Sequence, residues 1–110
     1  MNAEEPYVAI ARALKALANP TRLRIVRVLA DRELCLCQLQ PSFNLDKSTL
    51  SRHVAALISA GIVSQRRDGT RVFLRLSTLC ILSIFSCMAS VLRAEARSKA
   101  RLAKATEKIK

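Results

Sequence analysis

Two cysteines one residue apart, Cys35 and Cys37, are the residues of this chain best suited to bind a ligand. They lie in the segment ELCLCQL (residues 33–39). Paired thiolates are soft ligands that capture thiophilic ions. The segment STLSRH (residues 48–53) follows shortly after and carries the small polar and basic side chains of a DNA-reading helix. An ion bound beside a DNA-binding helix can move that helix. The two segments therefore predict an ion-sensing site and a DNA-binding element in one small domain.

The surroundings of the pair favour trivalent arsenic or antimony over zinc. Zinc commonly takes four ligands, and no histidine or acidic cluster accompanies the two thiols, whereas arsenite or antimonite needs at most three sulfurs. Cys80 and Cys87 are candidates for the third sulfur, although packing in a core or dimer interface is the favoured interpretation of both. A small thiol or water could take the same place. No organic cofactor is expected.

If both cysteines lie on a regular helix, their side chains point about 200° apart. We therefore expect an ion to reach both sulfurs only by deforming that turn, which would tilt the DNA-reading helix. Cysteines so placed are also poorly suited to a disulfide. The alternatives are that Cys35 and Cys37 are buried and act as small hydrophobes, or that they form a thiol redox sensor.

The net charge of the chain indicates nucleic acid as its first expected partner. The 110 residues include 19 Lys and Arg against 8 Asp and Glu, a formal net charge of +11, and this sign attracts phosphate backbones. A chain this short commonly needs a partner subunit, so a homodimer is expected. Residues 76–92 carry no charge, which raises a membrane as a second partner. That run is too short and too rich in serine for a spanning helix, so no membrane is expected.

Hydrophobic periodicity predicts a mainly α chain with a β-hairpin. A helix to about residue 18 precedes a second one that starts at Asn19-Pro20. Short and long helices follow over about 35–40 and 47–60, the latter capped by Asp46. Strands over 63–67 and 71–76 flank Asp68-Gly69, a strong hairpin signal. A final helix covers about 78–104.

This order is that of a dimeric winged helix-turn-helix with extra N- and C-terminal dimerisation helices, in a single domain over 1–110. Within it, about 1–18 and 78–104 are the dimerisation helices, about 33–61 the helix-turn-helix, about 62–76 the wing and 105–110 a basic tail. The first turns of the reading helix would contact base edges or phosphates in the major groove, and the wing the adjacent backbone. The expected DNA contacts are Lys47, Ser48, Thr49, Ser51, Arg52, His53, Arg66, Arg67 and Arg71. For His53 the alternative is an ordinary surface histidine.

The chain resembles the ArsR/SmtB family of metal-responsive repressors over most of its length. Residues 16–25 (ALANPTRLRI) are similar to the family's second-helix signature, and residues 51–63 to its recognition helix and exit. Residues 33–39 are similar to the metal box of the arsenic and cadmium branch, with Gln38 in place of an acid and Leu36 in place of Val. The resemblance implies a homodimer on a pseudo-palindromic operator that dissociates when an ion binds Cys35 and Cys37.

The resemblance is incomplete at the ion site. The third cysteine that often follows the box is absent, as are the N-terminal cysteines of the cadmium and lead branch and the histidine set of the zinc branch. The predicted function is a cytoplasmic, double-stranded-DNA-binding repressor released by As(III) or Sb(III). The alternatives are a response to Cd(II), Pb(II) or thiol oxidation, or no sensing through cysteines. An enzyme is not expected, because no histidine in the segment pairs with either thiol.

Overall fold

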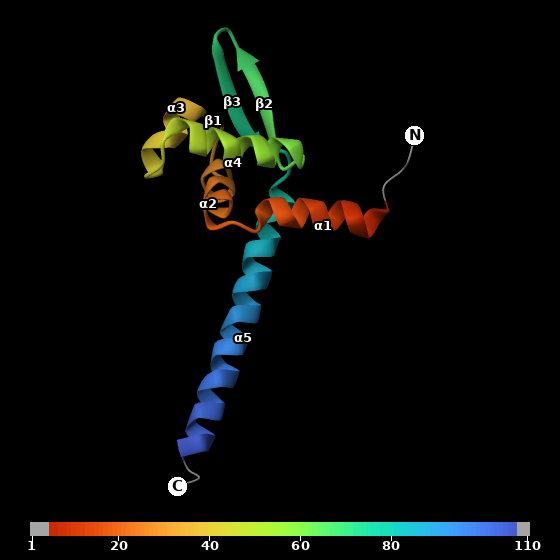
Figure 1. The fold of residues 1–110 in the computed structure, drawn as a ribbon, viewed down its shortest axis with the longest axis vertical. Coiled ribbons are helices and arrows are strands. Elements are labelled where there is room, and N and C mark those ends of the chain that lie inside the picture. Colours follow the sequence, from red (N-terminus) through yellow and green to blue (C-terminus); the bar gives the residue numbers. More distant parts are fainter. Residues whose placement is uncertain (1–4, 108–110) are drawn as a thin grey trace. The chain divides into compact units, whose positions relative to one another are not determined.

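The computed structural model describes residues 5–107, which divide into one compact unit ending at Leu79 and another beginning at Cys80 (Figure 1). The start of the predicted first helix, residues 1–4, and the end of the predicted basic tail, 108–110, lie outside the described residues. The first unit contains α1 (Pro6–Leu17), α2 (Pro20–Leu29), β1 (Leu34–Cys35), α3 (Leu36–Leu39), the 3-10 turn η1 (Gln40–Ser42), α4 (Lys47–Ser59), β2 (Val63–Asp68) and β3 (Arg71–Leu76). The 3-10 turn η2 (Leu79–Ile81) precedes α5 (Leu82–Glu107).

The helix boundaries follow from local capping. Asn19 caps α2, because its Oδ1 accepts from the backbone N–H of Thr21 at 2.9 Å and of Arg22 at 3.3 Å, with Pro20 as the first helical residue. Gly61 (φ 78°) ends α4 in the left-handed conformation. The Ile62 N–H then bonds to the Leu57 carbonyl at 3.0 Å, a Schellman closure. The sequence predicts Asn19 as the cap of α2 and Gly61 as the residue that closes α4, and both predictions are confirmed.

The wing is confirmed, with one strand more than predicted. β2 and β3 form an antiparallel hairpin that extends beyond the helices of the first unit (Figure 1). Its two-residue loop begins at Gly69 (φ 65°), so β2 runs one residue further than predicted. The missed strand is β1, whose Leu34 and Cys35 lie opposite Leu74 and Phe73 of β3. Two residues are too few to show a strand's alternating pattern in the sequence.

The core of the first unit is apolar and lies between the helices and the base of the sheet. Its fully or almost fully buried side chains come from α2, α3, α4 and β2: Ile25, Val26, Leu39, Leu50, Leu57 and Val63. The apolar periodicity of the sequence predicts an inward face of α4 made of Leu50, Val54, Leu57 and Ile58. The first three are buried and Ile58 is half-buried. With the helix-turn-helix α3–α4 followed by the hairpin, the first unit is a winged helix-turn-helix.

Candidate functional site

Cys35 and Cys37 do not both lie on a helix, which corrects the prediction. Cys35 ends β1 with an extended backbone (φ −79°, ψ 164°) and caps α3, whereas Cys37 is the second residue of α3. Pairing with β3 holds Cys35 in this conformation. Leaving the helix at Cys35 allows its side chain to turn toward Cys37, so no deformation of a helical turn is needed to bring the sulfurs together.

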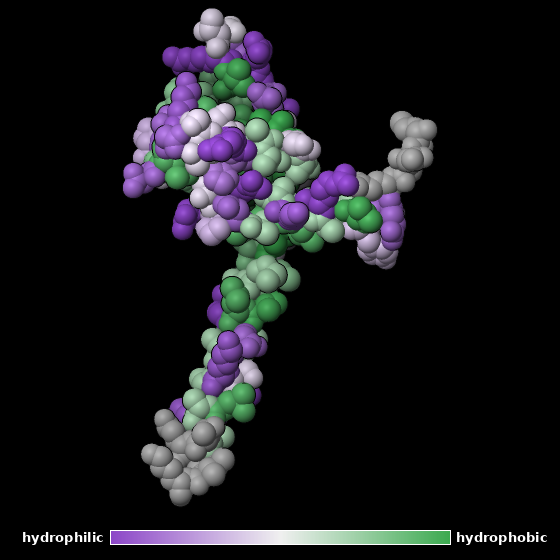
Figure 2. All heavy atoms as spheres, viewed as in Figure 1, coloured by the Kyte–Doolittle hydropathy of each residue, from purple (hydrophilic) through white to green (hydrophobic). Residues whose placement is uncertain are grey.

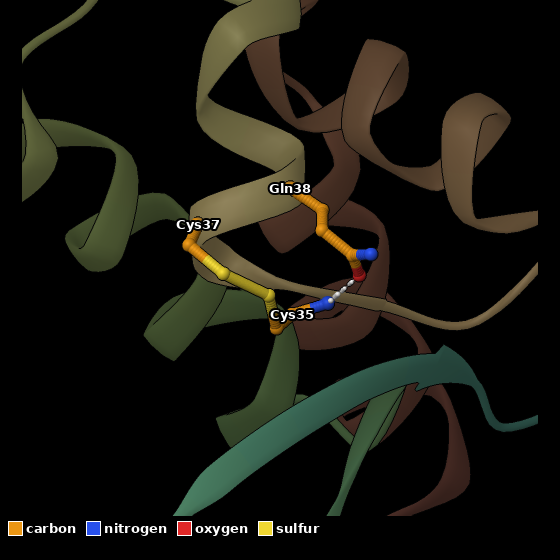
Figure 3. The surroundings of a disulfide bond; sticks show 3 residues. All are labelled: Cys35, Cys37 and Gln38. Carbon is orange, nitrogen blue, oxygen red and sulfur yellow. Dashed lines mark hydrogen bonds between the residues drawn. A yellow bond between two sulfur atoms is a disulfide. The ribbon is translucent and has the colours of Figure 1, made fainter.

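The two cysteines form a disulfide, contrary to the expectation that they were poorly placed for one (Figure 3). Their Cα atoms are 5.4 Å apart, within the range that disulfides span. The Gln38 side chain accepts from the backbone N–H of Cys35 at 3.0 Å, and the Gln38 backbone N–H donates to the Cys35 sulfur. Cys35 is 4% exposed and Cys37 is exposed to solvent, so only Cys35 behaves as a buried small hydrophobe.

A surface hollow of about 350 Å³ adjoins the disulfide. Cys37 and Gln40 line it from the α3 side, Lys47 from the start of α4, and Thr70 and Arg71 from the wing. The hollow therefore connects the cysteine pair to one predicted DNA contact on the reading helix and one on the wing. The sequence contained no signal for this arrangement, since residues 37, 47 and 71 meet only through the tertiary fold.

The third ion ligand stays a prediction. Within residues 5–107, no group of three or more His, Cys, Asp or Glu side chains is clustered as a metal site would require. Cys80 and Cys87 belong to the second unit, where both are exposed thiols. In their reduced form, Cys35 and Cys37 supply two sulfurs from adjacent positions. This donor set fits a trivalent metalloid whose remaining position is open, and it does not fit tetrahedral zinc.

Asp46 organises the N-terminal turn of α4. Its carboxylate accepts from the Ser48 hydroxyl, from the Thr49 hydroxyl at 2.5 Å and from the Thr49 backbone N–H at 3.3 Å. These hydrogen bonds, that of Ser48 foremost, lower the pKa of Asp46 to about 2. Arg52 in turn donates to the Thr49 hydroxyl at 3.4 Å. Two of the predicted DNA-contacting hydroxyls are thus held by the cap, while Arg52 is oriented along the same exposed surface.

His53 is half-buried and contacts α2. Its Nδ1 accepts a hydrogen bond of 3.1 Å from Nε of Arg22, which also donates to the carbonyl of Ala16. The bond to Arg22 ties the reading helix to α2. It engages one ring nitrogen of His53, whose DNA contact stays a prediction. This role of Arg22 was not predicted from the sequence. The only feature that marks Arg22 there is its position within residues 16–25, which are similar to the family's second-helix signature.

The wing arginines differ in their availability. Arg66 forms an ion pair with Glu33, with 2.9 Å between Nη2 and Oε2, and its guanidinium lies 4.8 Å from the ring centre of Phe73. The hydrogen bond from Arg66 lowers the pKa of Glu33. The side chains of Arg67 and Arg71 are exposed and make no ion pair with any residue in 5–107. Glu33, the first residue of the cysteine segment, is another partner that was not predicted from the sequence.

Apolar side chains are exposed on two helices at the ends of the chain. On α1, Tyr7 is 77% exposed and Ile10 is 55% exposed. On α5, Val91 and Leu92 are 52% and 64% exposed. Figure 2 shows hydrophilic side chains over the wing and apolar side chains at intervals along α5. The apolar periodicity of the sequence places Tyr7, Ile10, Leu14 and Leu17 on one face of α1. Within one chain this face is uncovered, apart from Leu17 at its end.

Comparison with known proteins gives one family. Residues 19–65 match the family described as "Bacterial regulatory protein, arsR family". A putative arsenical resistance operon repressor of Halobacterium salinarum is 43% identical over 58 residues, which are 51% of this chain and only 45% of that protein. The transcriptional activator HlyU of Vibrio cholerae is 40% identical over 81 residues, 71% of this chain and 75% of that protein.

Among solved structures, similarity extends to a homodimeric winged helix-turn-helix DNA-binding domain of Mycobacterium bovis. It is 30% identical with a TM-score of 0.69, and the match covers 84% of this chain and 91% of that domain. That domain is described as a possible ArsR-family transcriptional regulator. Sequence and fold thus agree on the class of protein to which this chain is similar.

Proposed function

Because the chain belongs to the ArsR family of DNA-binding transcriptional regulators, we propose that it is a homodimeric repressor that leaves its operator when arsenite or antimonite binds Cys35 and Cys37. The family and the fold are those of regulators and not of enzymes. The observation that carries the proposal is the position of the sulfur pair. It adjoins the hollow that Lys47 and Arg71 line, so a ligand held by the sulfurs lies beside residues proposed to contact DNA.

The proposed DNA surface combines α4 with the wing. Lys47, Ser48, Ser51 and Arg52 are exposed on the first turns of α4 and would enter the major groove, with Thr49 and His53 beside them. On the wing, Arg67 and Arg71 would contact phosphates. Arg66 would join them only by exchanging its ion pair with Glu33 for one with phosphate.

The proposed dimer buries the exposed apolar faces of α1 and α5. Such faces cost free energy in water, and a second copy of the chain covers them symmetrically. By length and apolar composition, the helical segment Leu79–Ala105, which includes most of α5, could also cross a membrane, since an 18-residue window within it has a mean hydropathy of 1.6. Its second half, however, carries Arg93, Arg97, Lys99, Arg101 and Lys104. Charges at this density favour dimerisation in the cytoplasm over a membrane span.

Binding of the metalloid requires the reduced pair. Each thiol replaces one hydroxyl of arsenite and releases one water, which leaves a third position on arsenic for a further ligand. To convert the repressor from mostly bound to mostly released, the inducer must favour the released form by roughly 3 to 5 kcal/mol. Metal–thiolate bonding beside Lys47 and Arg71 is a stronger source of this preference than rearrangement of exposed charges.

Gel-shift titration of operator DNA tests the proposal. The reduced protein is mixed with arsenite, antimonite, Cd(II) or Pb(II) in turn, and we expect release by the first two. Cys35→Ser and Cys37→Ser should bind the operator as the wild type does and lose the response. Cys80→Ser and Cys87→Ser should weaken the response only if one of these thiols supplies the third sulfur, and otherwise leave it unchanged. Arsenite release that survives in the Cys35→Ser, Cys37→Ser double variant would refute the assignment.

The disulfide favours one second candidate, a response to thiol oxidation. In that case operator affinity would differ between the oxidised and the reduced protein without any metalloid. The same gel shift distinguishes the two functions when it is repeated on oxidised protein. Equal operator binding by both redox forms excludes the second candidate and leaves the first intact.

A further inference from the structure

The hollow beside the disulfide has the features of a binding site for a small anion. Its volume of about 350 Å³ lies within the range of small-molecule sites, roughly 300–1,000 Å³. Two cations, Lys47 and Arg71, line it, and Gln40 and Thr70 add hydrogen-bonding groups. Another hollow, of about 300 Å³ between α4 and β3, is lined by no thiol and no ionisable side chain. Of these two hollows, the first alone therefore combines a disulfide sulfur with positive charge.

The two sulfurs differ in a way that sets the direction of thiol exchange. A thiolate must approach the disulfide along the sulfur–sulfur axis. Both cysteines line the hollow, but Cys37 is the exposed residue and Cys35 is only 4% exposed. The departing sulfur is then that of Cys35. Its negative charge is met by the backbone N–H of Gln38, which already donates to this sulfur. Attack on Cys37 from the hollow therefore has both access and a stabilised leaving group.

We propose that this hollow binds an anionic low-molecular-weight thiol, one bearing carboxylates, which reduces the Cys35–Cys37 disulfide. The thiolate forms a bond to the Cys37 sulfur as the bond to Cys35 breaks, and the electron pair leaves on Cys35. A second thiol then attacks the mixed disulfide, which releases Cys37 and the oxidised thiol dimer. Two thiols lose two electrons in all, and the protein gains two electrons and two protons.

This proposal rests on the proposed function of Cys35 and Cys37 as the sensing pair. It adds the thiol that keeps both cysteines reduced and therefore able to bind a metalloid. Lys47 and Arg71 attract a carboxylate-bearing thiol and repel a cationic one. Two cations within reach of one ligand charge near the surface change its local concentration by roughly tenfold at low salt. The same two residues are proposed to contact DNA, so thiol and DNA would compete for them.

The test measures the rate of disulfide reduction in the full-length oxidised protein, without DNA or metalloid. Glutathione, 2-mercaptoethanol and cysteamine supply negative, neutral and positive thiols, and each rate is divided by that thiol's rate with hydroxyethyl disulfide. We expect this normalised rate to be about tenfold higher for glutathione than for cysteamine, and the ratio to fall toward one in high salt.

Variants assign the preference to the hollow. Lys47→Ala with Arg71→Ala should bring the ratio close to one, whereas Arg24→Ala with Arg97→Ala removes the same net charge elsewhere and should preserve it. A glutathione-to-cysteamine ratio near one in the wild type overturns the proposal without any variant. A ratio that is unchanged by Lys47→Ala with Arg71→Ala also overturns it. Because the assay contains no inducer and no operator, its failure leaves the proposed function standing, and failure of arsenite release leaves this result standing.

Discussion

We expect the ion pair between Glu33 and Arg66 to withhold one wing cation from DNA. Arg66 donates to Glu33 at 2.9 Å through Nη2 and at 3.2 Å through Nε, and stacks over Phe73. Glu33→Gln removes the charge that holds Arg66 while keeping the side chain's size. The pair is partly exposed, so we expect the fold to be retained. The freed guanidinium can then reach a phosphate beside the wing.

The expected change is in the salt dependence of DNA binding. Each additional phosphate contact steepens the slope of log K against log salt by about 0.9, which is about 1.8 for a dimer with two wings. On lowering salt from about 1 M to about 0.1 M, each freed Arg66 then adds about eightfold to the gain in affinity. The effect should be equal on operator and random DNA, because phosphate contacts carry no sequence information.

Fluorescence anisotropy with labelled duplexes at a series of salt concentrations measures this slope. Glu95→Gln is the matched control, because Glu95 forms an exposed ion pair with Lys99 on α5, at 3.7 Å, and its loss changes the net charge equally. A slope that is the same in Glu33→Gln, Glu95→Gln and wild type would show that Arg66 contributes equally to DNA binding whether or not Glu33 is charged, and the reasoning would be refuted.

Three further predictions concern the reading helix, the dimer and the cap. In competition binding, Arg52→Ala should lose discrimination between operator and random DNA, costing roughly 1–3 kcal/mol, whereas Arg71→Ala should weaken both alike; equal loss of discrimination in both contradicts this division. Ile10→Glu or Val91→Glu should give folded monomers with weak operator affinity in sedimentation experiments, and persistent dimers would place the interface elsewhere. Because the pKa of Asp46 is lowered to about 2, its cap stabilises the fold fully when the pH is above the ordinary carboxyl pKa. This stabilisation is lost as the pH falls toward 2. Urea unfolding of Asp46→Asn should therefore show less loss of stability between pH 4 and 2, and an unchanged pH profile argues against the cap.

Local chemistry determined much of the fold directly from the sequence. Asn19 and Asp46 begin helices because their side chains accept hydrogen bonds from N–H groups of the first turn, a requirement that involves only neighbouring residues. Gly69 allows the hairpin turn for the same kind of reason, since its positive φ excludes most other residues. The apolar spacing of α4 likewise fixes which face is buried. These features need no knowledge of distant parts of the chain.

Tertiary contacts decided the chemistry of the site. Cys35 leaves the helix because β1 pairs with β3, nearly forty residues later in the chain, and this pairing brings the two sulfurs together. The two residues of a pair are likewise more than thirty positions apart in the sequence for Glu33–Arg66 and for Arg22–His53. No local pattern encodes such pairs, because each forms only when independent elements pack around a shared core. The sequence by itself therefore determined which residues can bind an ion or DNA, and the tertiary structure decided which of them are joined, held back or left exposed.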